Sequence, residues 1–224
     1  MIIQADACSS NWEVRAAAKR PARVRTLGPV LPGPAPTRGR LLVATPMLDD
    51  PNFDRSVVYM VEHHDEGALG LVLNRPSGEE LVDPLEGWVT AQSAPSRVFS
   101  GGPVEPDALI ALARLEHRVT AGSADEEDAN YLAPLTGDIA SADLAADPAL
   151  VIGRINALRV FRGYAGWEPG QLEAEIESGS WIVVDSDSSD VFTNEPDDLW
   201  RRVLRRQPGR LGWLAEAPDD LSWN

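Results

Sequence analysis

Polar side chains that could carry chemistry gather at the ends of two predicted strands. Apolar and β-branched residues at 56–61 and 68–73, on either side of Asp65, Glu66 and Gly67, predict a β-hairpin. Polar residues at the ends of buried strands commonly form either a binding site or a buried hydrogen-bond network. The sequence places three sets there: Asp49, Asp50, Asn52 and Arg55 before the first strand, Glu62 and His63 at its end, and Asn74 and Arg75 at the end of the second.

Catalysis at this cluster would depend on His63. Imidazole can act as a general base or acid near neutral pH, and Asp49 or Asp50 would orient it. Arg55 would then bind an anionic group. The alternative is structural, because the two aspartates can cap the turn through Pro51 and pair with Arg55. Neither interpretation identifies a substrate.

Two further pairs of residues could hold either a ligand or a corner of the fold. Gly101 and Gly102 precede a proline, and glycine pairs relieve tight backbone corners more often than they bind phosphate. Gln171 and Glu173 lie at the beginning of a predicted helix, where their side chains can donate and accept hydrogen bonds. All four are candidate binding residues, and both interpretations stay open.

Familiar metal, cofactor and nucleophile motifs are absent from the sequence. His63 and His64 are neighbours in a predicted strand and should point to opposite faces, and no HExxH pattern occurs. Cys8 is the only cysteine and Lys19 the only lysine, and both lie in the first 38 residues. This excludes multi-cysteine metal sites and places any Schiff-base or Walker-type lysine outside the predicted core. We therefore expect no metal and no cofactor.

Charge is distributed unevenly along the chain. The formal net charge is −15, yet residues 1–40 hold seven Lys or Arg against Asp6 and Glu13, which gives +5 and leaves −20 on residues 41–224. Such an acidic body repels nucleic acid, so nucleic-acid binding is expected only through the amino-terminal segment. No apolar run approaches the roughly 20 residues that span a bilayer, and no secretory signal is evident, so we expect a cytoplasmic protein with no membrane partner.

The order of predicted elements favours an α+β fold. Residues 1–38 are basic and proline-rich and are predicted to form a flexible extension, whereas 39–224 form a single domain. Further strands are predicted at 40–44, 98–100, 108–113, 160–164 and 181–184. Helices are predicted from Asp147-Pro148 with Val151, Ile155 and Leu158 on one face, at 169–178, and at about 197–206, with a surface loop at 121–130.

Four segments in a fixed order resemble the YqgE/AlgH family. They are Pro46 to Val57, Glu62-His63 through Gly70 to Pro76, Gly101 to Val104, and Gly163 to Trp167 followed by Gly170 to Glu173. The likeness extends from about residue 39 to the carboxyl terminus, and the closing residues and the use of arginine in place of lysine resemble actinobacterial members. The resemblance implies a strongly twisted, partly barrel-like mixed β-sheet surrounded by helices. It also implies a link to transcriptional regulation of exopolysaccharide, without a recognisable DNA-binding motif.

These observations favour a non-enzymatic regulatory or interaction protein that binds a protein partner or a small metabolite. The alternative is a hydrolase that uses His63 with Asp49 or Asp50, so enzymatic activity is not excluded. A weaker alternative is nucleic-acid binding through residues 1–38. The sequence leaves the oligomeric state open.

Overall fold

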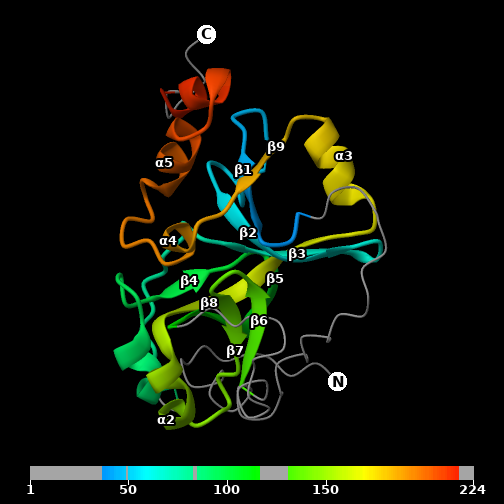
Figure 1. Cartoon of the computed structure of the whole chain (residues 1–224). Helices are drawn as coiled ribbons and strands as arrows, with labels where there is room; N and C mark the ends of the chain where they lie inside the picture. The colour runs from blue at the N-terminus through cyan, green and yellow to red at the C-terminus, as the bar shows by residue number, and fades with distance from the viewer. Residues whose placement is uncertain (1–36, 49, 83–84, 117–130, 217–224) are drawn as a thin grey trace.

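The apolar runs of the sequence pair into one curved, mixed β-sheet, shown in Figure 1. The computed structural model describes residues 37–48, 50–82, 85–116 and 131–216. Among them the strands are β1 Arg40–Ala44, β2 Val57–His64, β3 Gly67–Val72, β4 Val98–Ser100, β5 Val104–Leu115, β6 Leu132–Thr136, β7 Ile139–Ala142, β8 Ile155–Trp167 and β9 Trp181–Asp185. Their order is β6-β7-β5-β8-β3-β2-β1-β9, and β4 lies parallel to β8 while the other pairs are antiparallel.

Short helices cover this sheet. They are α2 Pro148–Val151, α3 Gln171–Glu177, α4 Ser188–Val191 and α5 Leu199–Arg205, with 3-10 turns at Glu86–Ala91, Ile152–Arg154 and Gly209–Glu216. In Figure 1, α3 and α5 flank the end of the sheet formed by β1, β2 and β9, and α2 lies at the opposite end. None of the helices in the described ranges is long and apolar enough to cross a membrane. The combination confirms the predicted α+β class.

Both faces of the central strands are buried, which explains their continuous apolar sequences. Leu41 and Tyr59 belong to the cluster that includes Trp200 of α5. Their neighbours Leu42 and Met60 point to the other face and join the cluster that includes Leu172 of α3. Because successive side chains of a strand point to opposite faces, a strand covered on both sides needs apolar residues at every position.

A bend in β8 joins the two halves of the sheet. Its first part pairs with β5 and β4, whereas Ala165 to Trp167 pair with β3. Gly163 lies between these parts with φ 67°, a left-handed conformation that favours glycine. A Cβ at Gly163 would lie 2.5 Å from the carbonyl oxygen of Gly102, so the backbone approach also requires glycine.

The sequence-based element assignments fail in the middle of the chain. The helix predicted through Leu158 ends at Val151 and its 3-10 continuation at Arg154, because Ile155 and Leu158 belong to β8 and pair with β5. Strands β6 and β7 were not predicted, and they form a hairpin around Gly137, which has φ 64°. The predicted loop at 121–130 and nearly all of the predicted extension at 1–38 lie outside the described residues.

The burial of Tyr59 in the core makes the stability of the protein depend on pH in the alkaline range. The Tyr59 side chain is fully buried, and its hydroxyl group lies near the Thr136 side chain without a hydrogen bond of normal geometry among the described residues. Burial raises the pKa of Tyr59 to about 12. Between pH 10 and 12 the unfolded chain therefore loses this proton while the folded chain keeps it, and the free energy of unfolding falls by up to about 1.4 kcal/mol per pH unit.

We expect Tyr59→Phe to remove this component of the alkaline loss of stability. At pH 7 we expect the substitution to change the free energy of unfolding by less than about 1 kcal/mol, because no hydrogen bond to the hydroxyl is lost. Urea unfolding of both proteins at pH 8, 10 and 11 measures the difference. Parallel stability curves for the two proteins across this range would contradict the prediction.

Candidate functional site

Asn74 and Arg75 fasten the turn that precedes β2. The Asn74 side-chain oxygen accepts a hydrogen bond from the Val57 amide at 2.9 Å, and its nitrogen donates to the Arg55 carbonyl at 2.9 Å. The Arg75 guanidinium donates to the Asp54 carbonyl. The structure thus brings these predicted site residues together with Arg55, in contacts that support the backbone of the turn.

Arg55 lies against α5. Its backbone adopts φ 49°, and its Cζ lies 5.1 Å from the centroid of the Trp200 ring. The Trp200 indole in turn donates a hydrogen bond to the Ala44 carbonyl at 2.8 Å. Arg55 therefore attaches the turn before β2 to the helix that covers this face of the sheet.

Asp50 and His63 lie at opposite ends of β2. The Asp50 carboxylate accepts hydrogen bonds from the backbone and side-chain nitrogens of Asn52, at 2.9 and 3.0 Å, as expected for an Asx turn. His63 lies six residues beyond Val57, and a rise of about 3.3 Å per residue separates the two ends of the strand by about 20 Å. The structure does not bring Asp50 to His63, and Asp49 lies outside the described residues.

His63 instead connects Thr37 with Glu173. Its Nδ1 lies 2.9 Å from the Thr37 hydroxyl and 3.3 Å from the Thr37 amide, and its Nε2 lies 2.8 Å from Glu173 Oε1. Because the Thr37 amide can only donate, Nδ1 accepts and Nε2 carries the proton shared with Glu173. A backbone hydrogen bond at Glu173 holds the pKa of this carboxyl below its usual value, and the hydrogen bond from His63 lowers it further.

The chain of hydroxyl, imidazole and carboxylate contains the groups of a nucleophile, its base and an orienting acid. Thr37, however, is only 4% exposed, and both its hydrogen-bond donors are directed at the same ring nitrogen. This arrangement ties the segment entering β1 to β2 and α3. The described contacts of Thr37 and His63 hold these segments of the fold together.

The neighbouring histidine in β2, His64, faces solvent. His64 Nε2 lies 3.9 Å from Glu62 Oε2, and the His64 side chain is 44% exposed whereas that of His63 is 7% exposed. The two histidines therefore point to opposite faces of β2, as predicted. In the described ranges no three His, Cys, Asp or Glu side chains are grouped as metal ligands would be.

Gly101 and Gly102 allow the corner between β4 and β5 to cross the bend of β8. The Gly101 amide donates to the Arg162 carbonyl at 2.8 Å, and its carbonyl accepts from Val72 at 2.9 Å. A Cβ at Gly101 would lie 2.3 Å from the Gly163 carbonyl oxygen, and one at Gly102 would lie 2.2 Å from the Tyr164 carbonyl carbon. Close backbone packing accounts for both glycines.

Gln171 holds the beginning of α3. Its side-chain oxygen accepts from the Glu168 amide at 3.0 Å, and its nitrogen donates to Glu175 Oε1 at 2.8 Å. The other oxygen of Glu175 accepts from the indole nitrogens of Trp167 and Trp181, at 2.9 and 2.8 Å. Gln171 and Glu175 thus fasten α3 to β8 and β9.

A groove of about 530 Å³ lies elsewhere, between the segment before β4 and the loop from α4 to α5. Pro76, Pro95 and Pro196 form apolar parts of its lining. Glu195, Asp197 and Asp198 add three exposed carboxylates, and the lining is completed by Arg97 and Asn194. The formal charge of the lining is therefore −2.

Arg159 donates hydrogen bonds to both segments that form this groove. Its Nη2 donates to the carbonyl of Ala94 at 2.8 Å and to that of Thr193 at 2.7 Å, and these residues directly precede Pro95 and Asn194 in the lining. The side chain is 1% exposed, and burial lowers the pKa of Arg159 to about 10. Its guanidinium carbon lies 4.2 Å from the centroid of the Phe99 ring.

Comparison with known proteins identifies this architecture. The profile of the AlgH-like family matches residues 41–212, most of the described chain. The chain belongs to the AlgH-like family. A UPF0301 protein of Streptomyces avermitilis is 48% identical over 83% of this chain and 94% of its own length, and one of Mycobacterium avium is 46% identical over 83% and 90%.

Two solved structures show the same AlgH-like fold. A crystal structure of a Corynebacterium diphtheriae protein superimposes with a TM-score of 0.71 at 30% identity, covering 84% of this chain and 94% of that one. The solution structure of AlgH from Pseudomonas aeruginosa has a TM-score of 0.57 at 28% identity, covering 86% of this chain and all of that one. The predicted family and fold are confirmed.

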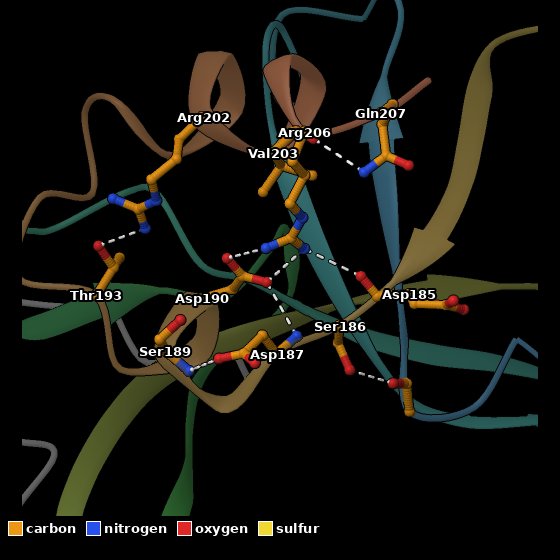
Figure 2. Close-up of polar contacts among 11 residues, drawn as sticks. Asp185, Ser186, Asp187, Ser189, Asp190, Thr193, Arg202, Val203, Arg206 and Gln207 are labelled. Atoms are coloured by element: carbon orange, nitrogen blue, oxygen red, sulfur yellow. Dashed lines mark hydrogen bonds and ion pairs between the residues drawn. The ribbon is translucent and has the colours of Figure 1, made fainter. Parts of the chain in front are cut away.

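In this AlgH-like chain a polar network fixes the groove wall formed by the loop after α4 (Figure 2). Asp190, 1% exposed as a side chain, pairs with both terminal nitrogens of Arg206 at 2.9 and 2.6 Å, and it also accepts from the Asp187 amide. The Thr193 hydroxyl accepts from Arg202 at 2.8 Å. Thr193 is thereby held through its hydroxyl by α5 and through its carbonyl by Arg159.

Neither Arg159 nor the groove was predicted from the sequence. An arginine between the apolar residues Leu158 and Val160 is a signal of a buried cation, although its backbone partners lie 65 and 34 residues away in sequence. The acidic run 195–198 is visible in the sequence, but its position opposite Pro76 and Arg97 depends on the tertiary fold.

Proposed function

We propose that this AlgH-like chain is a non-enzymatic interaction protein whose groove binds an arginine-rich segment of a partner protein. The observation that carries the proposal is the lining of the groove, which combines three carboxylates with three prolines. Arginine suits such a surface because its guanidinium pairs with carboxylates while its methylene groups pack on apolar rings.

The groove is supported before any partner binds. Proline has a fixed φ, and Arg159 and the Asp190–Arg206 pair connect the walls to buried parts of the fold. A binding surface that is already ordered loses less conformational entropy on association than a flexible one. The ordered walls of this groove therefore favour its use as a binding site.

The contacts of the strand-end residues support a binding function over a catalytic one. Asn74, Gln171 and His63 direct their polar atoms at other parts of the same chain. The groove residues Asn194, Glu195, Asp197 and Asp198 are exposed to solvent, and the Glu195 carboxylate lies 4.0 Å from a terminal nitrogen of Arg202. A small cationic metabolite would use the same carboxylates, and the test below includes it as a competitor.

The test measures binding of a short fluorescein-labelled peptide of alternating arginine and alanine to the full chain by fluorescence anisotropy. We expect binding that weakens as salt rises to about 0.5 M, because exposed charges are screened. The combined change Glu195→Gln, Asp197→Asn and Asp198→Asn should weaken binding about tenfold, equivalent to about 1.4 kcal/mol.

A matched control separates the groove from the overall negative charge. Glu66→Gln, Glu80→Gln and Glu177→Gln change the net charge equally at exposed positions outside the groove and should weaken binding less than twofold. Equal weakening by the two triple variants would overturn the proposal. Displacement of the peptide by free arginine at a similar concentration would assign the groove to a metabolite instead.

A further inference from the structure

We infer that the groove is occupied, in the absence of a partner, by the arginine-rich segment 15–25 of the same chain. The inference rests on the proposed function, since it assigns the same groove and the same ligand chemistry. It adds a regulatory element, because a partner must then displace a segment that is covalently attached to the domain.

Charge complementarity is the first argument. Segment 15–25 contains Arg15, Lys19, Arg20, Arg23 and Arg25 and no acidic residue. The groove lining contains three carboxylates and the cation of Arg97, and Arg202 lies 4.0 Å from the Glu195 carboxylate. At physiological ionic strength, salt screens the attraction between exposed charges that lie more than about 8 Å apart. The basic segment is therefore attracted strongly only when it lies close to the carboxylates of the groove.

The reach of the chain is the second argument. Thr37 is fixed to His63 by two hydrogen bonds, so the point at which the segment joins the domain is defined. Twelve residue steps separate Arg25 from Thr37, and at full extension these span about 40 Å. Segment 15–25 can therefore sample the surface that lies within about 40 Å, measured along the extended chain, of its attachment at Thr37.

Attachment also favours the segment over a free ligand. A tethered segment acts at an effective concentration of roughly 1 mM. If its own Kd for the groove is about 0.1 mM, the apparent affinity of a competing peptide falls about tenfold. The match to the AlgH-like family begins at residue 41, so the segment lies outside the region that carries the family resemblance.

The first experiment uses the only lysine of the chain. Zero-length carbodiimide coupling of the full-length protein joins the Lys19 amine to carboxylates in contact with it, and peptide mass mapping identifies them. We expect cross-links from Lys19 to Glu195, Asp197 or Asp198, and their loss at about 1 M salt. Cross-links spread over carboxylates outside the groove would overturn the inference.

The second experiment measures competition with the arginine–alanine peptide. Replacement of Arg15, Lys19, Arg20, Arg23 and Arg25 by glutamine should increase the affinity of the full chain for this peptide about tenfold. The increase should vanish when Glu195, Asp197 and Asp198 are also neutralised.

The outcomes distinguish the two proposals. Equal, groove-dependent binding to the native and tail-neutralised chains would overturn this inference and leave the proposed function standing, whereas binding to neither would overturn both. If the full chain binds duplex DNA through segment 15–25 with an affinity that is insensitive to neutralisation of the groove, the segment is a nucleic-acid ligand and the inference is wrong.

Discussion

Replacement of Arg159 by alanine is expected to lower the free energy of unfolding by about 4 kcal/mol. Two effects add. The change removes one of the largest fully buried side chains and leaves a cavity beside Phe99. It also leaves the buried Thr193 carbonyl without the Arg159 donor, which costs about 1–3 kcal/mol, whereas the Ala94 carbonyl belongs to an exposed residue and can bind water.

Arg159→Met separates the two effects, because methionine retains most of the volume and removes the donors. We expect a loss of about 2 kcal/mol for this variant, together with weaker binding of the arginine–alanine peptide because the groove walls lose their connection. Urea unfolding at pH 7 measures the stability of each variant. If Arg159→Met were as stable as the native chain or more stable, the penalty of burying the cation would outweigh its hydrogen bonds, and the assigned role would be wrong.

Replacement of Arg206 by methionine is expected to lower the free energy of unfolding by about 3–4 kcal/mol. The Asp190 carboxylate is almost completely buried, and Arg206 is its paired cation at 2.6 and 2.9 Å. Without Arg206, the buried Asp190 carboxylate would lose its paired cation and keep the hydrogen bond from the backbone amide of Asp187. Breaking a buried pair by removing one partner is strongly destabilising for this reason.

Arg205→Met provides the control, because Arg205 is the last residue of α5 and directly precedes Arg206. Arg205 pairs with Glu216 at 3.2 Å, but these side chains are 53% and 71% exposed. An exposed pair contributes about 0–1 kcal/mol, so this variant should be nearly as stable as the native chain. Similar unfolding midpoints for the two variants in urea would show that the Asp190–Arg206 pair does not stabilise the junction of α4 and α5.

The sequence predicted elements whose signals are local. The β2–β3 hairpin follows from two apolar runs and an intervening turn, and α3 follows from Pro169 before it and Gly179 after it. The first part of β8 was mistaken for helix because Val151, Ile155 and Leu158 have helical spacing. Pairing with β5 decides the conformation there, and that pairing connects Ile155 to Leu115 and Leu158 to Ala113, residues 40 and 45 positions apart.

The candidate site was harder to predict because its contacts are distant in sequence. Both His63 and Glu173 were selected as polar candidates, but their pairing across 110 residues depends on how α3 lies against β3 and β9. Proximity in sequence favoured Asp49 and Asp50 as partners, and the length of β2 places Asp50 at the wrong end. The groove draws on three separate segments, and no periodicity of the chain indicates that they meet.

The most direct test of the groove is an NMR titration of the full chain with segment 15–25 neutralised, using the unlabelled arginine–alanine peptide as ligand. If the groove binds the peptide, backbone amide shifts change together at Arg97 and at residues 194, 195, 197 and 198, while those of Thr37, His63 and Glu173 do not change. Shift changes centred on Thr37, His63 and Glu173, with none at the groove, would contradict binding at the groove.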